Sequence, residues 1–493
     1  MTGDFKSSVP SGLWYSALQA ADALKGARAV TVAAHIDADG ISASAIARKS
    51  LERLGTVAKV EFFKKLDPQA IDGLRTSGSD LIWFVDLGSG SLSKIDGTKA
   101  VVTDHHMPDT IAKSNEKSGQ MHLSDFSTVV HVNPHLHGIS GASELSGAGS
   151  TFLAALALDE RNADLAHLAV LGSVGDLQDQ RTRRLEGLNR AILKLAESRG
   201  LISTVEDIRY FGRETRPIHK LLEFSSDPFL PRITGNEDNS IAFLVELGIE
   251  LKDEEAWRTW SDLTDSEKTK IIDALRDHLE QSRRRPETIA RLVGEIYVLL
   301  KEQKHTPVRD AKEFATLLNA CGRHGRGEIG LRICSGDRGE ALAEGETLLR
   351  NHRSALSKAL SWAKGSGIVR MKNIQFFDAG DEIEDTIVGI VAGMLLGGEG
   401  ADRTAPMIAF AESTEYSDSP KVKASARGTQ DLVSRGMDLS AAIRAAAEGV
   451  GGIGGGHNIA AGATIPADRK QDFLSALDDL VGRQISARES RRG

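Results

Sequence analysis

The chain has 493 residues, of which 40% are hydrophobic and 26% charged, as in an ordinary globular protein. At about 150 residues per domain, this length predicts two to four domains. The formal net charge of −8 excludes a protein that coats nucleic acid by being basic throughout. It still allows an enzyme with a local basic groove, because metal-binding carboxylates make the total negative.

Cysteine content and the apolar runs indicate the compartment. Cys321 and Cys334 are too few for a disulfide framework or a structural zinc site, so we expect reduced thiols. The first residues lack the basic-then-apolar layout of a signal peptide. No apolar run approaches the roughly 20 residues of a membrane span. We therefore expect a soluble cytoplasmic protein without a membrane partner.

Short β-rich runs alternate with helical patterns over the first two hundred residues. Helices are expected at 41–54, which Gly55 ends, and between 147 and about 199. The strand-like runs are Ala29–Ala34, Val57–Phe63, Leu81–Val85, Ala100–Thr103 and Thr128–Val132. Short apolar strands separated by helices predict a parallel sheet with helices on both faces. Ligands bind at the carboxyl ends of the strands in such sheets.

Residues 201–305 are predicted to form a largely helical connector. Helices are expected at Asp253–Leu279 and Thr288–Leu300, and prolines at 217, 228 and 231 mark loops. The run Arg283–Arg285 is either a nucleic-acid contact or a solvated helix end. Trp257 and Trp260, three residues apart on the first expected helix, belong either to the core or to an interface.

The α/β character returns after residue 311. Strands are expected at Ile329–Cys334, Ile368–Phe377, Met407–Phe410 and Val422–Ala426, and helices at Gly339–Ala363, Glu384–Leu396 and Ser440–Glu448. The predicted fold class is therefore α/β in three parts. An N-terminal parallel-sheet domain spans 1–200, the helical connector 201–305, and a C-terminal α/β domain 306–493.

Acid and histidine clusters follow three of the N-terminal strands. The candidates are His35, Asp37 and Asp39 in HIDADG, Asp86 after LIWFV, Asp104, His105 and His106 after AVVT, and Asp176 in the later GSVGD. A single Asp at a strand end is often only a helix cap. Crowded carboxylates, however, repel each other unless cations are bound. Carboxylates and imidazoles suit manganese, or magnesium with more water, so the series predicts a metal site.

Two further N-terminal segments have alternative interpretations. His131, His135 and His137 are either metal ligands or part of a loop, and the turn residues Asn133, Pro134 and Gly138 favour the loop. The stretch 146–150 (SGAGS) opens a helix, whose N-terminus could contact a phosphate.

Three glycine-containing segments of the C-terminal part are suited to phosphate. Glycine lets backbone amides approach a phosphate closely, and arginine grips it with two hydrogen bonds. Tight turns are the alternative interpretation. The candidate residues are Arg323, His324 and Arg326 in CGRHGR, Ser425 and Arg427 in SARG, and Gly455, Gly456 and His457 in GGGHNIAAG.

These segments resemble a known family over nearly the whole chain. HIDADG, the strand ending at Asp86, DHH at 104–106 and GSVGD resemble the four motifs of the DHH phosphoesterases. GGGHNIAAG resembles the hallmark loop of the DHH-associated C-terminal domain. FGRETRPIHK at 211–220 resembles a stretch of archaeal RecJ-like proteins.

The resemblance implies a role for each candidate residue. His35, Asp37, Asp39, Asp86, His105 and Asp176 would be the metal ligands. Asp86 would bridge two ions, His106 would lie beside the scissile phosphate, and Asp104 would orient the histidine pair. The substrate would be bound by Arg323, His324, Arg326, Ser425, Arg427, Gly455, Gly456 and His457.

The function implied by this resemblance is a metal-dependent phosphodiesterase. We expect a RecJ-like single-strand-specific exonuclease that hydrolyses DNA, RNA or both with two divalent ions, manganese before magnesium. Its context would be archaeal DNA repair and replication, with a GINS-type replication complex as partner. The alternatives are a small-oligonucleotide or cyclic-dinucleotide phosphodiesterase and a non-catalytic replisome subunit. The last class loses metal ligands, whereas every expected position is filled here.

Overall fold

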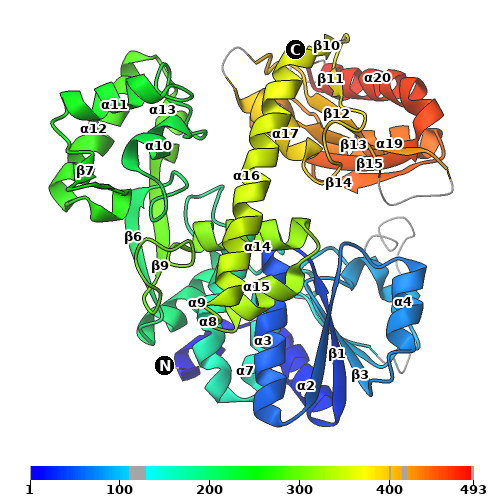
Figure 1. The fold of residues 1–493 in the computed structure, drawn as a ribbon. Helices are drawn as coiled ribbons and strands as arrows, with labels where there is room; N and C mark the ends of the chain where they lie inside the picture. The colour runs from blue at the N-terminus through cyan, green and yellow to red at the C-terminus, as the bar shows by residue number, and fades with distance from the viewer. Residues whose placement is uncertain (1, 110–128, 399–400, 414–418, 490–493) are drawn as a thin grey trace. The chain divides into compact units, whose positions relative to one another are not determined.

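The structure is a computed structural model, and it describes residues 2–109, 129–398, 401–413 and 419–489. The chain divides into two compact units, Met1–Leu349 and Arg350–Gly493 (Figure 1). No described helix combines the length and apolar character that crossing a membrane requires.

The first unit contains the predicted parallel sheet (Figure 1). Its five strands run in the order β2–β1–β3–β4–β5, and all neighbours are parallel. The strands are β1 Ala29–His35, β2 Val57–Phe63, β3 Leu81–Val85, β4 Ala100–Thr103 and β5 Val129–Val132. All five strand predictions are confirmed, except that Thr128 lies outside the described residues. The inner strands β3 and β4 are wholly buried, as expected for strands covered on both faces.

Helices cover both faces of this sheet. They are α1 Thr2–Ser8, α2 Ser11–Lys25, α3 Ala38–Leu54, α4 Pro68–Arg75, α5 Leu92–Ile95, α7 Gly147–Leu158, α8 Ala166–Gly175 and α9 Gly187–Ser198. Successive side chains of β3 point to opposite faces of the sheet and belong to two different hydrophobic cores. Trp83 belongs to the large core with α2, α3, α7 and α8, whereas Phe84 packs in a smaller core with α4 and α5.

The turn from β1 into α3 is determined locally. Asp37 caps α3 by accepting a hydrogen bond from Gly40 N at 2.9 Å. Gly55 ends the helix at φ 81°, in the left-handed region where glycine is favoured. The sequence HIDADG therefore lies between the carboxyl end of a strand and the start of a helix.

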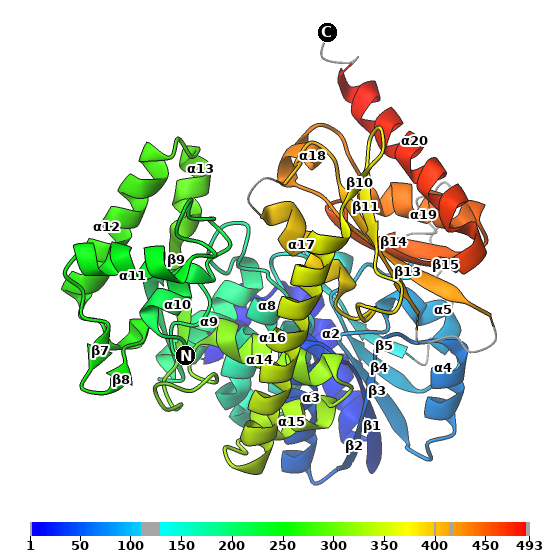
Figure 2. The same cartoon turned by 45° about the horizontal axis from the view of Figure 1, so that its top comes forward.

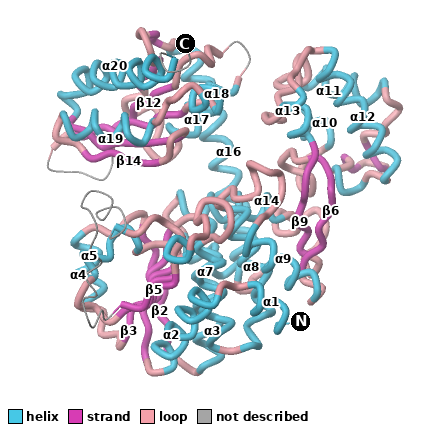
Figure 3. The backbone as a smooth tube through the Cα atoms, turned by 180° about the vertical axis from the view of Figure 1, so that it is seen from behind, coloured by secondary structure: helices cyan, strands magenta, loops and turns pink. Residues whose placement is uncertain are grey.

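The connector contains a two-stranded ribbon that was not predicted (Figure 3). Strand β6 Ile202–Ile208 pairs antiparallel with β9 Val293–Leu299, so the helix predicted at Thr288–Leu300 is wrong. The apolar residues of VGEIYVLL fit the spacing of a helix and of a strand equally well. The segment forms a strand because it pairs with β6, which is distant in the sequence. The other elements are α10 Ile218–Glu223, α11 Glu237–Glu246, β7 Lys252–Asp253, β8 Ala256–Trp257, α12 Asp265–Gln281 and α13 Pro286–Ile289.

The helix predicted at Asp253–Leu279 is wrong in its first part. A β7–β8 hairpin comes first, and α12 begins only after the capping box made by Thr264 and Glu267. Trp257 and Trp260 therefore do not share a helix. Trp257 lies on β8 and is 44% exposed, whereas Trp260 is 1% exposed.

A buried ionic group ties the connector to the rest of the first unit. Trp260 Nε1 donates to the Asp207 carboxylate at 3.0 Å. Arg213 donates to the same carboxylate at 2.5 Å and to Asp310 at 3.0 Å. Because Asp310 caps α14, these bonds connect the ribbon and Trp260 to a helix of the main core.

Helices α14 Ala311–Arg323, α15 Gly327–Cys334 and α16 Glu340–Ser366 follow the connector. The strand predicted at Ile329–Cys334 is wrong, because this segment is the helix α15, which packs on α3 and α14 in the main core. A short apolar run does not reveal its period by itself. The compact units divide at Leu349, so Arg323, His324 and Arg326 belong to the first unit.

The second unit is a mostly antiparallel sheet in the order β10–β11–β12–β13–β15–β14. Its strands are β10 Val369–Arg370, β11 Gln375–Asp378, β12 Met407–Glu412, β13 Lys421–Arg427, β14 Ile453–Gly456 and β15 Ala460–Pro466. Its helices are α17 Val388–Gly397, α18 Gln430–Ser434, α19 Leu439–Gly449 and α20 Lys470–Glu489. Helix α17 covers one face of this sheet, and α19 and α20 cover the other (Figure 2). The predicted strand Ile368–Phe377 is two strands with a turn between them.

Candidate metal centre

The predicted ligands meet at the carboxyl edge of the parallel sheet. His35 ends β1, Asp86 follows β3, and the Asp104–His106 segment follows β4. Asp176 is the C-cap residue of α8, directly after its last residue Gly175. Parallel strands end at the same edge of a sheet, so motifs far apart in the sequence converge there.

Three groups of these side chains could each hold a cation. In each group, one ligand atom per residue lies within 4.8 Å of the others. The groups are His35, Asp37 and Asp86; Asp39, His105 and Asp176; and Asp86, Asp104, His105 and His106. All eight predicted metal and catalytic residues are therefore brought together, although no ion is part of the structure.

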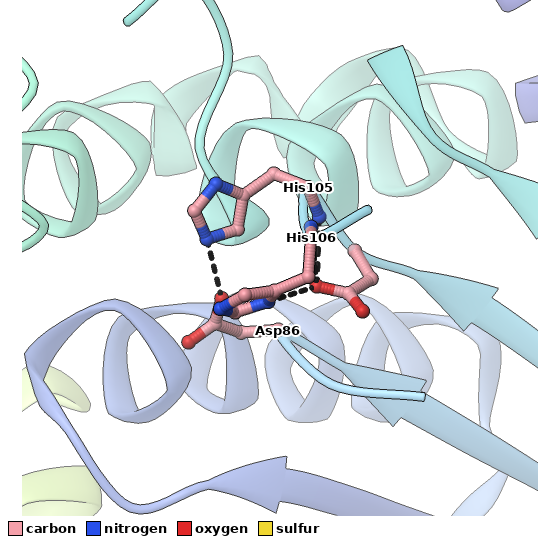
Figure 4. A group of neighbouring side chains, drawn as sticks. Asp86, His105 and His106 are labelled. Carbon is pink, nitrogen blue, oxygen red and sulfur yellow. Dashed lines mark hydrogen bonds and ion pairs between the residues drawn. The ribbon is translucent and has the colours of Figure 1, made fainter. Parts of the chain in front are cut away.

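Asp86 belongs to two of the three groups, and its carboxylate faces the His105 ring (Figure 4). One carboxylate oxygen lies 3.3 Å from His105 Nε2, and the other lies 3.4 Å from His35 Nδ1. Asp86 is 1% exposed, and neither oxygen accepts a hydrogen bond from any described residue. Its φ of 59° lies in the left-handed region, which costs backbone energy. A buried carboxylate without donors fits a cation ligand, because a cation removes the cost of burying the charge.

Asp39 is held by the start of α7. Gly147 N and Ala148 N donate to its carboxylate at 2.8 and 2.9 Å, and Ser146 Oγ donates at 3.1 Å. The anion at this helix N-terminus is therefore the protein's own carboxylate rather than the phosphate suggested by the sequence.

The electrostatics of the cluster reflect crowded negative charge. Burial, followed by the charge of Asp86, raises the pKa of Asp39 well above its usual value. Burial also raises the pKa of Asp176. For His105, burial alone would lower the pKa, but the neighbouring Asp86 and Asp176 raise it well above the usual value. Bound cations would take the place of these protons.

Asp104 positions the two histidines. It is buried and accepts hydrogen bonds from Ser89 N at 2.9 Å and from His105 N at 2.7 Å. His106 Nδ1 lies 2.8 Å from the same carboxylate. Burial would raise the pKa of Asp104, but the charge of His106 holds it far below its usual range. The His106 ring is half exposed, so its Nε2 is the nitrogen left for a substrate.

Glycines at two sequence motifs make room for the carboxylates. A Cβ at residue 147 would lie 2.3 Å from Asp86 Oδ1. A Cβ at residue 172, the first glycine of GSVGD, would lie 2.3 Å from Asp39 Oδ1. Both helices can therefore approach the cluster only because these positions lack a side chain.

The end of α14 packs against the first metal-binding loop. A Cβ at Gly322 would lie 1.8 Å from Ile36 O, and Asn319 Oδ1 accepts a hydrogen bond from Ala38 N at 2.9 Å. Burial lowers the pKa of the adjacent Arg323, and the charge of Asp37 opposes that shift. Arg323 is therefore close enough to the metal cluster to interact with it.

The other two residues of this segment have different surroundings. Arg326 forms ion pairs with Glu328 at 2.5 Å and with Glu344 at 2.6 Å, and His324 is exposed. A role of Arg326 in substrate binding would require it to give up these pairs.

The second unit gathers its candidate residues at one end of its sheet. Arg427 on β13 pairs with Ala460 of β15, and His457 lies in the turn that joins β14 to β15. Gly462 pairs with both Ser425 and Gly455. Gly456 has φ 141°, and a Cβ there would lie 2.6 Å from the Ala461 backbone.

A Cβ at Gly389 of α17 would lie 2.7 Å from Arg427 Nη2, so the guanidinium lies against this helix.

Of the three histidines at 131, 135 and 137, the first lies on a strand and the other two lie in a loop. His131 lies on β5, and its Nε2 is 2.9 Å from Ser89 Oγ. His135 and His137 lie in a short 3₁₀ turn that Asn133 caps, as the turn residues predicted. None of the three belongs to a candidate metal group among the described residues.

Two buried amides behind the cluster, Gln178 and Asn189, were missed in the sequence. Gln178 contacts Asp176 directly, at 2.8 Å. Its position two residues after GSVGD was the available signal, whereas Asn189 lies on another helix and gave none.

Three family models match the chain. The DHH family N-terminal domain matches residues 29–172, the DHH-CID domain 210–293 and the DHHA1 domain 371–483. The chain belongs to the DHH superfamily. Each match falls inside one of the three predicted parts. Membership identifies a hydrolase of the phosphodiesterase type with a metal-binding centre.

A protein of Methanocaldococcus jannaschii whose function is not described is 29% identical over 464 residues, which cover 92% of this chain and 94% of that protein. Among solved structures, RecJ from Thermus thermophilus in complex with Mn²⁺ has a TM-score of 0.57 at 19% identity. The alignment covers 96% of this chain but only 55% of that RecJ.

Two further solved structures have the same fold along nearly their whole length. A manganese-bound exonuclease RecJ has a TM-score of 0.55 at 20% identity, with 97% of this chain and 96% of that chain covered. CDC45 from Entamoeba histolytica has a TM-score of 0.60 at 11% identity, with 92% and 95% covered. The RecJ-like fold of this chain therefore occurs together with the cluster of acidic and histidine side chains at the sheet edge.

Substituting Gly147 tests the close approach of α7 to the metal cluster. Gly147→Ala would place a methyl group against Asp86 and displace its carboxylate, so we expect Mn²⁺ affinity to fall by at least about tenfold. Isothermal titration with Mn²⁺ measures the change. Gly73→Ala is the matched control, because Gly73 also lies in a helix and has nothing within 4 Å of the added Cβ. Equal affinities for both variants would contradict the proposed packing.

Proposed function

We propose that this protein is an exonuclease that hydrolyses single-stranded DNA or RNA with two divalent ions, Mn²⁺ as the first candidate and Mg²⁺ as the second. The observation that carries the proposal is the placement of Asp86. Its two carboxylate oxygens face different histidines, at 3.3 and 3.4 Å, and accept no hydrogen bond from the described residues. This geometry suits a carboxylate shared by two ions.

The ligands divide around Asp86 into two sets. One Asp86 oxygen lies 3.4 Å from His35, which forms a candidate group with Asp37 and Asp86. The other lies 3.3 Å from His105, which forms a second candidate group with Asp39 and Asp176. A bound pair of cations would lower the pKa of a water molecule and stabilise the charge of the phosphoryl oxygens. The RecJ structures with the same fold were solved with Mn²⁺ or Mg²⁺, which supports this metal assignment.

The protein's own side chains would bind and orient the phosphodiester. His106 is held at Nδ1 by Asp104 and presents Nε2 on a half-exposed ring, which suits a hydrogen bond to a phosphoryl oxygen. Arg323, near Asp37, would neutralise a neighbouring phosphate. In the second unit, Arg427 and His457 lie at one end of the sheet and would bind the backbone of a longer strand.

A non-catalytic replisome subunit is the second candidate, because CDC45 has the same fold. The filled ligand set argues against it. Unpaired buried carboxylates destabilise a protein, so a chain that never bound metal would gain stability by losing them.

Digestion of end-labelled single-stranded DNA and RNA tests the exonuclease proposal. With Mn²⁺ or Mg²⁺ we expect stepwise shortening from one end, and chelation should abolish it. A small-substrate phosphodiesterase would instead cleave dinucleotides or cyclic dinucleotides and leave long strands intact. Absence of cleavage with either metal would favour the non-catalytic role.

The variant Asp86→Asn tests the shared carboxylate. Asparagine keeps the shape and tolerates the left-handed backbone, so the fold should survive. It removes the charge between the two ions, and we expect kcat to fall by more than about a hundredfold, beyond the loss typical of groups that only support a ligand. Circular dichroism of the same sample checks the fold. A kcat near that of the unmodified protein would remove Asp86 from the site.

Variants of the second unit test how long strands are bound. Arg427→Ala and His457→Ala should raise KM several-fold for long strands and much less for dinucleotides, because a dinucleotide needs only the metal cluster. Arg444→Ala is the control, since it removes an equal charge from the exposed face of α19. Equal losses on both substrates would place Arg427 and His457 in the reaction centre.

We also propose a GINS-type replication complex as a partner of the connector. Trp257 is 44% exposed, with the His219 ring centroid 4.5 Å from its own, at a tilt of 54°, and Lys252 Nζ 4.8 Å from its ring. Exposed tryptophans beside cations are frequent at interface hot spots. The surface lies within the residues that match the DHH-CID domain.

A pull-down with the cognate GINS complex tests this partner. We expect Trp257→Ala to lose binding and Asp86→Asn to keep it, because the two residues lie in different parts of the first unit. Tyr15→Ala is the control, since Tyr15 is an exposed aromatic residue outside the connector. Binding lost in Asp86→Asn would mean that the partner needs the metal cluster.

A further inference from the structure

The chain reverses direction immediately after the metal ligand Asp176. Leu177 adopts φ 59°, the left-handed conformation that usually requires glycine at a helix end. Gln178 N then donates back to Ser173 O at 3.1 Å. Because of this reversal, the Gln178 side chain points back toward Asp176. Gln178 is only 3% exposed, whereas Leu177 is 58% exposed. The backbone is thus strained at the position that brings Gln178 inward.

The Gln178 amide joins two predicted ligands. Its Nε2 donates to Asp176 Oδ2 and to Gly141 O, both at 2.8 Å. The same Gly141 O lies 2.6 Å from His105 Nδ1. A carbonyl oxygen can only accept, so His105 Nδ1 carries a proton and Nε2 remains as the coordinating nitrogen. Gln178 therefore fixes Asp176 directly and His105 through the carbonyl that sets its tautomer.

Asn189 extends this network to the third ligand. Its Nδ2 donates to Gln178 Oε1 at 2.6 Å, which fixes the direction of the glutamine amide. Its Oδ1 accepts from Ser173 Oγ at 2.9 Å and from Ser146 N at 3.3 Å. Ser146 Oγ in turn donates to Asp39. Asn189 is 1% exposed, so both amides of the network are buried.

We propose that Gln178 is a positioning residue, which together with Asn189 orients Asp39, His105 and Asp176 for one of the two ions. This inference rests on the proposed two-ion function. The amides suit the task because they donate hydrogen bonds without adding charge to a site already crowded with carboxylates. A glutamate at residue 178 would lose both donors and place a further negative oxygen beside Asp176.

Metal titration tests the proposal directly. Gln178→Glu and Gln178→Met should each weaken Mn²⁺ binding by about tenfold to a hundredfold, the loss typical when a group that supports a ligand is removed. Asn189→Asp keeps the acceptor for Ser146 and Ser173 but loses the donor to Gln178, so it should show a smaller loss. Gln180→Glu is the control, because Gln180 is the same residue type and is exposed two positions along the chain.

Kinetics separate positioning from a general effect on the fold. At limiting Mn²⁺, Gln178→Met should lower kcat while KM for the strand stays the same, and excess Mn²⁺ should restore most of kcat. The metal-free variants should keep the circular dichroism and melting temperature of the unmodified protein. The Gln180→Glu control should match the unmodified protein in every measurement.

Two results would overturn the proposal. The first is Mn²⁺ affinity in both Gln178 variants equal to that of the unmodified protein. The second is loss of the metal-free fold in both variants, because the amide would then support the fold rather than the ligands. If the unmodified protein binds Mn²⁺ but cleaves no strand, the exonuclease function fails, while the titration still decides the role of Gln178.

Discussion

The buried charge of Asp86 is the constraint on which the rest of the site depends. A carboxylate that is 1% exposed and accepts no hydrogen bond from the described residues needs positive charge beside it to offset the cost of its burial. Histidines stand on both sides of it, and Asp37, Asp39 and Asp176 complete a strongly negative cluster. Burial and the charge of Asp86 raise the pKa of Asp39, and the neighbouring carboxylates raise the pKa of His105 against the effect of its burial, so the cluster suits a bound cation.

Most of the surrounding architecture serves to bring these groups together. The parallel sheet places three strand ends at one edge, and the helices α7 and α8 approach closely because Gly147 and Gly172 have no side chain. Asp37 belongs to the cluster and also caps α3. The Asp39 carboxylate accepts a hydrogen bond from the N-terminus of α7. The same carboxylates therefore stabilise helix ends and build the site, so the metal cluster and the fold of the first unit are closely coupled.

The fold similarity to both RecJ and CDC45 does not choose between a nuclease and a replisome subunit. The side chains at the sheet edge favour the nuclease, because all eight predicted metal and catalytic residues cluster there and a buried amide donates to Asp176 behind them. The connector provides a different kind of surface. Trp260 is buried and donates a hydrogen bond to Asp207, which anchors the connector, whereas Trp257 is 44% exposed.

The sequence by itself determined the parallel sheet and its strand ends, and it predicted the eight residues that cluster at the sheet edge. These features depend on local signals, namely apolar runs of strand length followed by acids and histidines. It failed at β9 and α15, where a short apolar run fits either period and a distant neighbour chooses the structure. It also could not reveal that Asp86 accepts no hydrogen bond from the described residues, or that the Asp39 carboxylate accepts one from Gly147 N at the start of α7. Nor could it reveal that Asn189 donates to Gln178 and accepts from Ser146 N. Those contacts join residues far apart in the chain, and only tertiary packing brings such residues to hydrogen-bond distance.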